Sequence, residues 1–394
     1  MKVGLIFDQK RSQGGGFYQS VNMVRFFKKK TNLKFDTISF NKQISKDLIL
    51  SGIDNNFIRL SFFDKIISFL FSKNFFLEFF IFFRLQTKIE KFFIKKNIDL
   101  LIFLSPSRHV YLFHTINYIS TVWDLNHLTH IELNEIRNYG EIVYRDQRYL
   151  NTLKQSYRII VESQTTKEQL VDYYNIPINR VIEIPFLSFF ESIEKKDIQK
   201  DYSFELLSLD LENMNYFIYP SNYWKHKNHY TLVKAIKLFI NKNKNFKFIF
   251  CGFDKGNYEH ISNFILESNL QSHVYLFKFL KEEELMYLYS KCYALIYPSL
   301  FGPTNLPILD SWYFKKPVLC SNNMFQMVGN AALTFDPMNS KEIYQQMITI
   351  LDKTKYKNLI SNGTKRLNYF KKLNENNLSR LAEDMLKLQE ILDL

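Results

Sequence analysis

Residues 296–312 read IYPSLFGPTNLPILDSW, and this stretch carries the strongest indication of the fold. Its apolar beginning predicts a short buried strand that ends at Pro298, and its second half predicts a helix that begins near Pro307. The turn between them contains Gly302, Pro303, Thr304 and Asn305. Because the first N–H groups of a helix have no partner inside the helix, a turn at this position is suited to bind an anion.

Strand and helix patterns alternate on both sides of that stretch. In the second half, buried strands are predicted at 215–220, 246–252, 273–279, 294–299 and 316–321, and a helix at 229–240. In the first half, strands are predicted at 2–7, 98–104, 119–125 and 157–163. A glycine run at 14–16 follows the first strand and precedes a helical pattern. This alternation predicts α/β domains with parallel sheets covered by helices on both faces.

Two such domains fit the length of 394 residues. The polar, weakly periodic residues 186–213 mark the expected boundary. We expect a first domain at 1–195 and a second domain at 196–375, with the C-terminal helix, 376–394, packing back on the first domain. The apolar face of that helix is predicted to consist of Leu378, Leu381, Met385, Leu388 and Ile391.

Positive charge and phenylalanine are concentrated in residues 1–100. These residues hold 18 Lys or Arg against 8 Asp or Glu, and 19 of the 39 Phe, whereas the net charge of the whole chain is +13. Such a surface attracts anionic membranes. The alternative is a compositional bias of the genome, which explains the asymmetry less well. Residues 57–96 are predicted to form amphipathic helices, unless their Phe side chains belong to the core.

Several classes of protein are disfavoured by what the sequence lacks. The three cysteines, Cys251, Cys292 and Cys320, have no metal-ligand or disulfide spacing. No run of about 18 uncharged apolar residues and no export signal is present, so we expect a cytoplasmic protein, with peripheral contact at the inner face of the membrane. A nucleic-acid-binding protein is compatible with the charge, but no binding module is found.

The candidate binding residues follow from the absence of the common nucleotide motifs. The chain has no GxxxxGK[ST], no GxGxxG after its first strand and no Asp-x-Asp. A bound diphosphate would therefore be neutralised by protein donors, without metal and without a further cofactor. Lys227, in the sequence WKHKNH before a predicted helix, suits this role, and Lys225 lies in the same turn. Asp310 is placed to accept hydrogen bonds from ribose hydroxyls; its alternative role is to stabilise the helix dipole.

From about 214 to 350 the sequence resembles the retaining glycosyltransferases of family 4, in a subgroup with an FGPTNLP-type donor loop. The matching segments are YPSNYWKHKNH, LKEEELMYLYSKCYALIYPSLFGPTNLPILDSWYFKKPV and GNAALTFDP; GGGFYQS and TVWDLNHLTHIE match more weakly. The resemblance implies the α/β GT-B fold, in which two Rossmann-like domains with parallel sheets face a cleft. It also implies a nucleotide-sugar donor and a glycan or lipid-linked acceptor.

The resemblance assigns roles to individual residues. The catalytic residues would be Asp124, His127 and Lys227. The donor would be bound by Gly15, Gly16, Lys225, Lys227, Pro303, Thr304, Asn305, Leu306 and Asp310. Three family residues are replaced here: Gly302 stands for a Glu, Ser221 for an Arg, and Trp123 for a His. His127, His130 and Glu132 have no metal-ligand spacing, so we expect no metal site.

The expected function is transfer of a sugar from a nucleotide-diphosphate sugar to a hydroxyl acceptor, with retained configuration, in the assembly of cell-surface polysaccharide or lipopolysaccharide. Two alternatives share the fold. A nucleotide-sugar epimerase or hydrolase would act without an acceptor, and a non-catalytic sugar-nucleotide-binding subunit would show no turnover.

Overall fold

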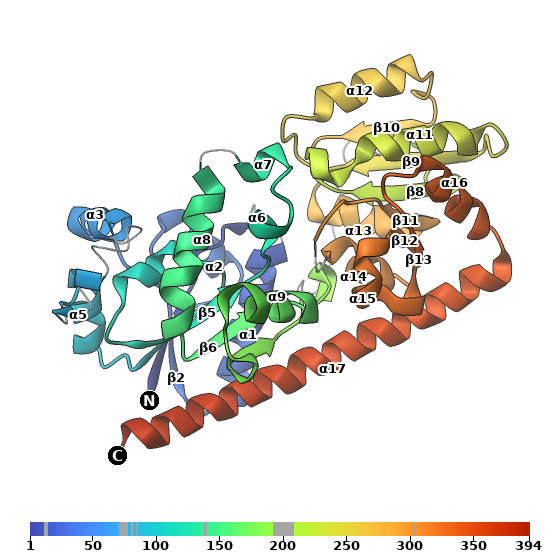
Figure 1. Ribbon diagram of the computed structural model, residues 1–394. Coiled ribbons are helices and arrows are strands. Elements are labelled where there is room, and N and C mark those ends of the chain that lie inside the picture. Colours follow the sequence, from blue (N-terminus) through green and yellow to red (C-terminus); the bar gives the residue numbers. More distant parts are fainter. Residues whose placement is uncertain are drawn as a thin grey trace. The chain divides into compact units, whose positions relative to one another are not determined.

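The computed structural model describes residues 1–11, 15–70, 78–79, 82–83, 85–137, 140–191, 209–302 and 305–394. The chain forms two compact units (Figure 1). Unit 1 consists of Met1–Phe186 together with Lys372–Leu394, and unit 2 consists of Leu187–Lys371.

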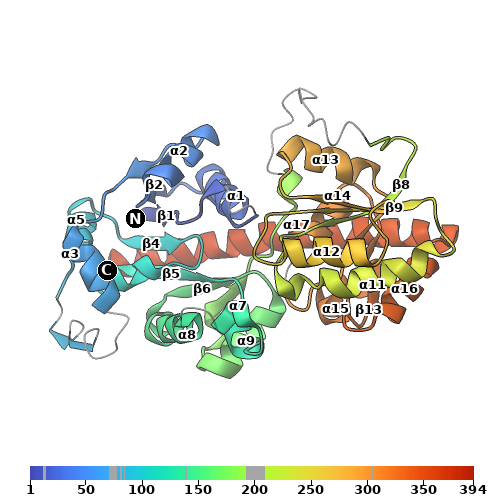
Figure 2. The ribbon, with the colours of Figure 1, turned by 90° about the horizontal axis from the view of Figure 1, so that it is seen from above.

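Unit 1 is built on a seven-stranded parallel sheet. Its order is β3-β2-β1-β4-β5-β6-β7. The strands are β1 (Lys2–Ile6), β2 (Lys34–Ser39), β3 (Asn56–Phe57), β4 (Leu100–Phe103), β5 (Asn117–Val122), β6 (Arg158–Val161) and β7 (Val181–Glu183). The central strands are apolar and fully buried, as expected for a parallel sheet with helices on both faces. The chain order reverses between β1 and β4, which lie side by side (Figure 2).

The helices of unit 1 connect these strands. They are α1 (Gly15–Lys30), α2 (Lys42–Leu50), α3 (Phe62–Leu70), α5 (Lys88–Lys95), α6 (Asn126–Thr129), α7 (Asn134–Arg137), α8 (Glu141–Thr152) and α9 (Gln164–Tyr174). Short polar side chains begin several of them: Asn41 caps α2, Thr87 caps α5 and Ser163 caps α9. Each cap satisfies a backbone N–H group that the helix itself leaves without a partner.

Unit 2 has a six-stranded parallel sheet with the order β10-β9-β8-β11-β12-β13. The strands are β8 (Asn215–Pro220), β9 (Phe246–Cys251), β10 (Val274–Phe277), β11 (Ala294–Tyr297), β12 (Val318–Ser321) and β13 (Leu333–Phe335). The helices are α11 (His229–Ile240), α12 (Tyr258–Glu267), α13 (Glu282–Lys291), α14 (Leu306–Tyr313), α15 (Phe325–Val328) and α16 (Ser340–Thr349). Here the chain order reverses between β8 and β11, which pair directly.

The last helix is much longer than the sequence predicted. The expected helix covered 376–394, but α17 (Lys353–Leu392) has 40 residues and begins in unit 2 (Figure 1). Its final part belongs to unit 1, where Leu378, Leu381, Met385 and Leu388 are buried. Asn374 and Asn377 fix this part by donating to the backbone oxygens of Pro185 and Glu183. The prediction for Ile391 was wrong, because this side chain is exposed.

The Phe-rich segment of unit 1 divides between core and surface. Phe93 of α5 is fully buried, but Phe62, Phe63 and Phe69 of α3 are 73%, 59% and 63% exposed. The Phe side chains of 57–96 are therefore not simply core. In the part of the chain that the structure describes, no helix combines the length and the apolar character needed to cross a membrane.

Candidate functional site

The reversal of chain order in the unit 2 sheet places two loops next to each other. In open α/β sheets, ligands bind beyond the carboxyl ends of the strands at the point where strand order reverses. In unit 2 this point lies between β8 and β11. The loop after β8 contains the short 3-10 helix Lys225–Lys227, and the loop after β11 contains Ser299 and Gly302. We take these two loops as the candidate site.

Lys227 is the central charge of this site. Its Nζ donates to the Tyr297 hydroxyl at 3.0 Å and to Ser299 Oγ at 3.3 Å, and it lies 5.3 Å from the centre of the Tyr297 ring. No carboxylate of the described residues pairs with it. Two neutral hydroxyls orient the ammonium group without cancelling its charge. Lys227 can therefore attract an anion at the strand-order reversal.

The turn that carries Lys227 is firmly held. Asn228 adopts a left-handed conformation, with φ of 57°, and its amide donates to the backbone oxygens of Pro298 and Pro337. The buried Tyr219 donates to the backbone oxygen of Lys227 at 2.5 Å. From the other loop, the N–H of Leu300 donates to the His226 oxygen. These bonds join the two loops and fix the position of the Lys227 backbone.

Lys225 and His226 occupy different environments in the same turn. Lys225 is exposed. His226 is buried, and its ring stacks on Phe301 with centres 4.1 Å apart. Ser221, which stands where the family has an Arg, is buried and close to the backbone of Gly252. Of Lys225 and His226, only Lys225 therefore has an exposed side chain that could supply positive charge in place of that Arg.

The loop after β11 has a conformation that requires glycine. Gly302 has φ of +129°, and a Cβ atom at this position would lie 2.7 Å from Asn305 Oδ1. The Asn305 amide donates to the Gly302 oxygen and accepts a hydrogen bond from the Tyr297 hydroxyl. Asn305 thus occupies the space that a Gly302 side chain would need. The predicted site residues Pro303 and Thr304 lie outside the described residues.

The beginning of α14 lies directly beyond this loop. Asn305 is the N-cap residue of α14, but its side chain does not bond to the N–H groups of the first turn because Gly302 and Tyr297 engage it. Leu306 is the first residue of the helix. Among the described residues, no side chain therefore caps the positive end of this helix, which favours a bound anion.

Asp310 is held from inside unit 2. It is 5% exposed, and its Oδ1 accepts hydrogen bonds from Ser188 Oγ at 2.7 Å and from the Phe189 N–H at 2.9 Å. Burial raises the pKa of Asp310 to about 7, against the lowering effect of these two hydrogen bonds. No described residue contacts Oδ2 through a hydrogen bond. The ribose contact of Asp310 stays a prediction, and only Oδ2 is available for it.

In unit 1, the predicted glycine residues lie at the start of α1. Gly15 is its first residue, and Gly16 packs against Trp123: a Cβ at Gly16 would lie 2.3 Å from Cη2 of that ring. Glycine is required at 16 because the indole, which replaces the family's His, occupies the adjacent space. This packing accounts for Gly16 without a ligand.

Asp124 and His127 are not brought together as free groups. The Asp124 carboxylate pairs with Arg145 at 2.8 Å and accepts the N–H of Asn126. His127 is fully buried, contacts the Tyr174 hydroxyl through Nε2 at 3.2 Å, and has its pKa lowered to about 3 by burial and by Arg145. A buried, neutral imidazole cannot reach a substrate here, so we do not retain His127 in the candidate site.

Sequence reasoning missed several polar groups. It did not identify Tyr297 and Ser299, which contact Lys227 from positions 70 and 72 residues away. It also missed a cluster of Asp8, Ser107 and His109 in unit 1. The apolar run around Tyr297 indicated only a strand, and hydroxyl residues are too common to be assigned a partner from their spacing.

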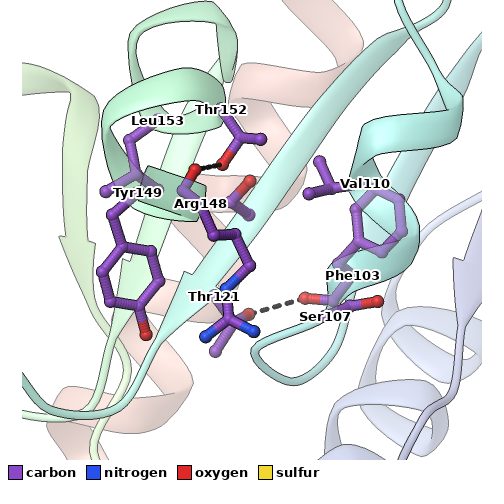
Figure 3. Close-up of a pocket in the computed structure, with 9 residues that line it drawn as sticks. Phe103, Ser107, Val110, Thr121, Arg148, Tyr149, Thr152 and Leu153 are labelled. Atoms are coloured by element: carbon purple, nitrogen blue, oxygen red, sulfur yellow. Dashed lines mark hydrogen bonds between the residues drawn. The ribbon is translucent and has the colours of Figure 1, made fainter. Parts of the chain in front are cut away.

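A pocket near that unit 1 cluster is too small for a substrate (Figure 3). Its lining includes Ser107, Thr121 and Arg148, and the Arg148 guanidinium points toward Thr121 between α8 and β5. The cavity volume is ≈ 10 Å³, which is enough for about one water molecule. A nucleotide sugar therefore cannot bind inside it.

Comparisons with known proteins agree with this geometry. Residues 208–366, which make up most of unit 2, match the family model described as Glycosyl transferases group 1. The O-antigen chain mannosyltransferase RfbU of Salmonella typhimurium is 26% identical over 194 residues, covering 48% of this chain and 50% of that protein. O-antigen chain mannosyltransferase B of Escherichia coli is 21% identical over 197 residues, covering 49% and 51%. The chain spans about half the length of the curated relatives it matches.

Solved structures resemble the chain over nearly its full length. A glycosyltransferase from Rickettsia africae has a TM-score of 0.68 with 16% identity, covering 99% of this chain and 98% of that one. Anabaena Alr3699/HepE, solved in complex with UDP and glucose, has a TM-score of 0.70 with 14% identity, covering 97% and 99%. The chain has the GT-B fold with two Rossmann-like units, and the comparisons support a group 1 glycosyltransferase.

Proposed function

We propose that this protein is a group 1 glycosyltransferase that moves a sugar from a nucleotide-diphosphate sugar to a hydroxyl acceptor. The observation that carries this proposal is Lys227, a cation without a carboxylate partner among the described residues, held by two hydroxyls at the strand-order reversal of unit 2. The match of residues 208–366 to the group 1 family supports the same assignment.

The proposed chemistry uses this charge when the donor bond breaks. The acceptor oxygen forms a bond to the anomeric carbon, and the bond from that carbon to the diphosphate breaks with its electron pair remaining on the diphosphate. Lys227 and the uncapped start of α14 stabilise the developing negative charge. The acceptor proton goes to the departing diphosphate, which is consistent with attack from the same face and with retained configuration.

Transfer is proposed to need no divalent metal. In the described residues no group of three or more His, Cys, Asp or Glu could hold a metal ion. The positive charge that a metal would supply would instead come from Lys227, whose ammonium group is held by the Tyr297 hydroxyl. Asp310 is proposed to accept a ribose hydroxyl through Oδ2, so that replacing UDP with its 2′-deoxy form should weaken binding in the parent but not in Asp310→Ala, which has no polar atom at this position.

The names of the curated relatives support a proposal for the kind of biosynthesis to which the reaction belongs. Two of them are named O-antigen chain mannosyltransferases, so we propose a role in assembling a cell-surface polysaccharide or lipopolysaccharide, on a glycan or lipid-linked acceptor. GDP-mannose is accordingly the first donor to test. Because HepE was solved with UDP, UDP-sugars come next.

A membrane surface is proposed as the further partner, in contact with α3 and α5. These helices contact each other: Asp64 accepts the N–H of Ile89, and Lys88 Nζ lies 4.7 Å from the centre of the Phe63 ring. The exposed large apolar side chains of these two helices are Phe62, Phe63, Ile66, Phe69, Phe92 and Ile94. The exposed cations around them are Lys65, Lys88, Lys91, Lys95 and Lys96. Exposed aromatic side chains on helices that also carry exposed lysines suit the boundary of an anionic bilayer.

The direct test is turnover with excess EDTA. The protein is incubated with GDP-mannose and with a panel of UDP-sugars, with and without a membrane-lipid extract as acceptor, and the product anomer is read by NMR. We expect transfer only with an acceptor, undiminished by EDTA, and with retained configuration. Nucleotide release without an acceptor would favour an epimerase or hydrolase. Donor binding without any turnover would indicate a non-catalytic subunit.

A further inference from the structure

Unit 1 has a polar cluster at the reversal of chain order in its own sheet. Asp8 follows β1, whereas Ser107 and His109 follow β4, and these two strands pair side by side (Figure 2). Because both strands are parallel, their carboxyl ends lie at one edge of the sheet. The cluster therefore occupies in unit 1 the place that Lys227 occupies in unit 2, where open α/β sheets bind ligands.

The cluster is ordered by bonds among its own members. His109 Nδ1 lies 3.1 Å and 3.0 Å from the two carboxylate oxygens of Asp8. Ser107 Oγ donates to Asp8 Oδ2 and accepts the backbone N–H of His109 at 3.0 Å. The His109 ring also packs edge-on against Phe40, with centres 4.9 Å apart. These contacts fix both the position and the plane of the imidazole.

The bonds determine which atom of His109 is available. Burial alone would raise the pKa of Asp8, but His109, Ser107 and Arg108 together bring it below its ordinary value, so the group is a carboxylate. A carboxylate only accepts hydrogen bonds, so Nδ1 must carry the proton that it donates to Asp8. In the neutral ring Nε2 is then an acceptor, and no described residue bonds to it. The His109 side chain is 21% exposed.

The hydrogen bonds of Ser107 differ from those of a serine nucleophile. In serine hydrolases, the hydroxyl proton is directed at the imidazole, which removes it. Here the hydroxyl of Ser107 is directed at Asp8, and no bond joins it to the His109 ring among the described contacts. Ser107 is therefore not arranged to attack a substrate.

The charges indicate the kind of ligand. The unit 2 site presents an ammonium group, which suits a diphosphate, whereas this cluster contains a carboxylate bonded to Ser107 and His109 and an imidazole whose Nε2 has no hydrogen-bond partner among the described residues. Arg108, whose positive charge helps to lower the pKa of Asp8, is exposed. We propose that Asp8, Ser107 and His109 form a binding site for a hydroxyl group of the sugar acceptor, with His109 Nε2 accepting its hydrogen bond. The choice of an acceptor sugar rests on the proposed function.

The proposal can be tested without knowing the natural acceptor. Protein labelled with 15N in its histidine rings is titrated with methyl α-mannopyranoside, methyl β-galactopyranoside and methyl β-N-acetylglucosaminide, with UDP or GDP present. We expect at least one glycoside to shift the His109 Nε2 signal more than that of any other histidine. His109→Ala should weaken its binding by about three- to tenfold, the usual effect of losing one neutral hydrogen bond. His260→Ala, at an exposed position of α12, is the matched control.

A second variant separates orientation from packing. Asp8→Asn keeps the size of the side chain, but its amide can donate to Nδ1 and move the ring proton to Nε2. We expect the 15N spectrum to report this tautomer and glycoside binding to weaken as in His109→Ala. If no glycoside perturbs His109, or if both variants bind like the parent, this proposal is overturned. The proposed function fails separately if UDP and GDP do not bind at all.

Discussion

At the scale of single residues, Asp310 shows how burial changes the chemistry of one carboxyl group. Its pKa rises from 3.8 to about 7, mainly because it is removed from water. Between these two values the unfolded chain has released the proton while the folded protein still holds it. The folded state is therefore favoured below pH 3.8, and this contribution is lost as the pH rises through about 7.

Asp310→Asn removes that dependence. The amide oxygen can still accept from Ser188 and Phe189, so the structural contact is kept. We expect the unfolding temperature of the variant to gain on the parent as the pH rises from about 4 to about 7, equivalent to at most about 4 kcal/mol. Thermal unfolding at a series of pH values measures this. A constant difference between variant and parent would show that Asp310 does not titrate in this range.

Sequence patterns could indicate those candidate site residues that lie in a local motif, but not those that only the fold brings together. Lys227 could be singled out because a basic turn between a strand and a helix is a local pattern. The contact between Asp8 and His109 joins residues 101 positions apart, which no spacing reveals. His127 is buried against Tyr149 and Tyr174, which come from two other helices. The residues next to His127 in the sequence therefore did not indicate that it would be buried.

At the scale of elements, the loop after β11 depends on Gly302. Gly302→Ala would force a side chain into a left-handed backbone and against Asn305, which in turn anchors Tyr297. We expect a loss of about 1–3 kcal/mol in stability and weaker nucleotide binding. Gly256→Ala is the matched control, since φ is +91° there but nothing lies within 4 Å of the added atom. Equal nucleotide affinity in both variants would argue against a role for this loop in donor binding.

The start of α1 depends on a second close contact. Gly16→Ala would place a Cβ within 2.3 Å of the Trp123 ring, and overpacking of this kind usually costs about 1–3 kcal/mol. Combining it with Trp123→His, which is a smaller ring and restores the family's residue, should recover most of that loss. Urea unfolding of the two single variants and the double variant tests the coupling. Additive effects would show that the two residues do not compete for the same space.

Local patterns predicted most elements of both sheets, because buried parallel strands are continuous apolar runs. Helix α11 begins and ends where its apolar spacing indicated, at 229 and 240. The true length of α17 was not evident, because residues 353–375 are rich in Lys and Asn and show a weaker apolar face. Packing against the rest of the protein, which the sequence alone does not display, extends that helix.

At the scale of the whole molecule, exposed lysines of α3 and α5 contribute to the excess of positive charge in residues 1–100. We expect the protein to co-sediment with vesicles that contain anionic lipid and to dissociate as salt is raised, because surface attraction is screened over about 10 Å at 0.1 M. Phe62→Ser with Phe69→Ser should reduce binding at least about tenfold, since two exposed aromatic side chains no longer enter the bilayer boundary.

The control for that experiment lies in unit 2. Phe253 and Phe279 are also exposed and contact each other, with ring centres 5.4 Å apart, but they are outside α3 and α5. Changing both to Ser should leave vesicle binding unaltered. Equal binding of the parent to neutral vesicles, or equal loss in both pairs of variants, would mean that the basic aromatic surface does not direct the protein to a membrane.

The central claim is that Lys227 supplies the charge that holds a nucleotide diphosphate, and calorimetric titration with UDP and GDP tests it most directly. Lys237→Ala, on the exposed side of α11, is the matched control for loss of one positive charge. Lys227→Ala should weaken the binding of the nucleotide that the parent prefers by about 1.5–3 kcal/mol, or roughly 10- to 150-fold, whereas Lys237→Ala should bind like the parent. Unchanged affinity in Lys227→Ala, or the same loss in both variants, would contradict the account.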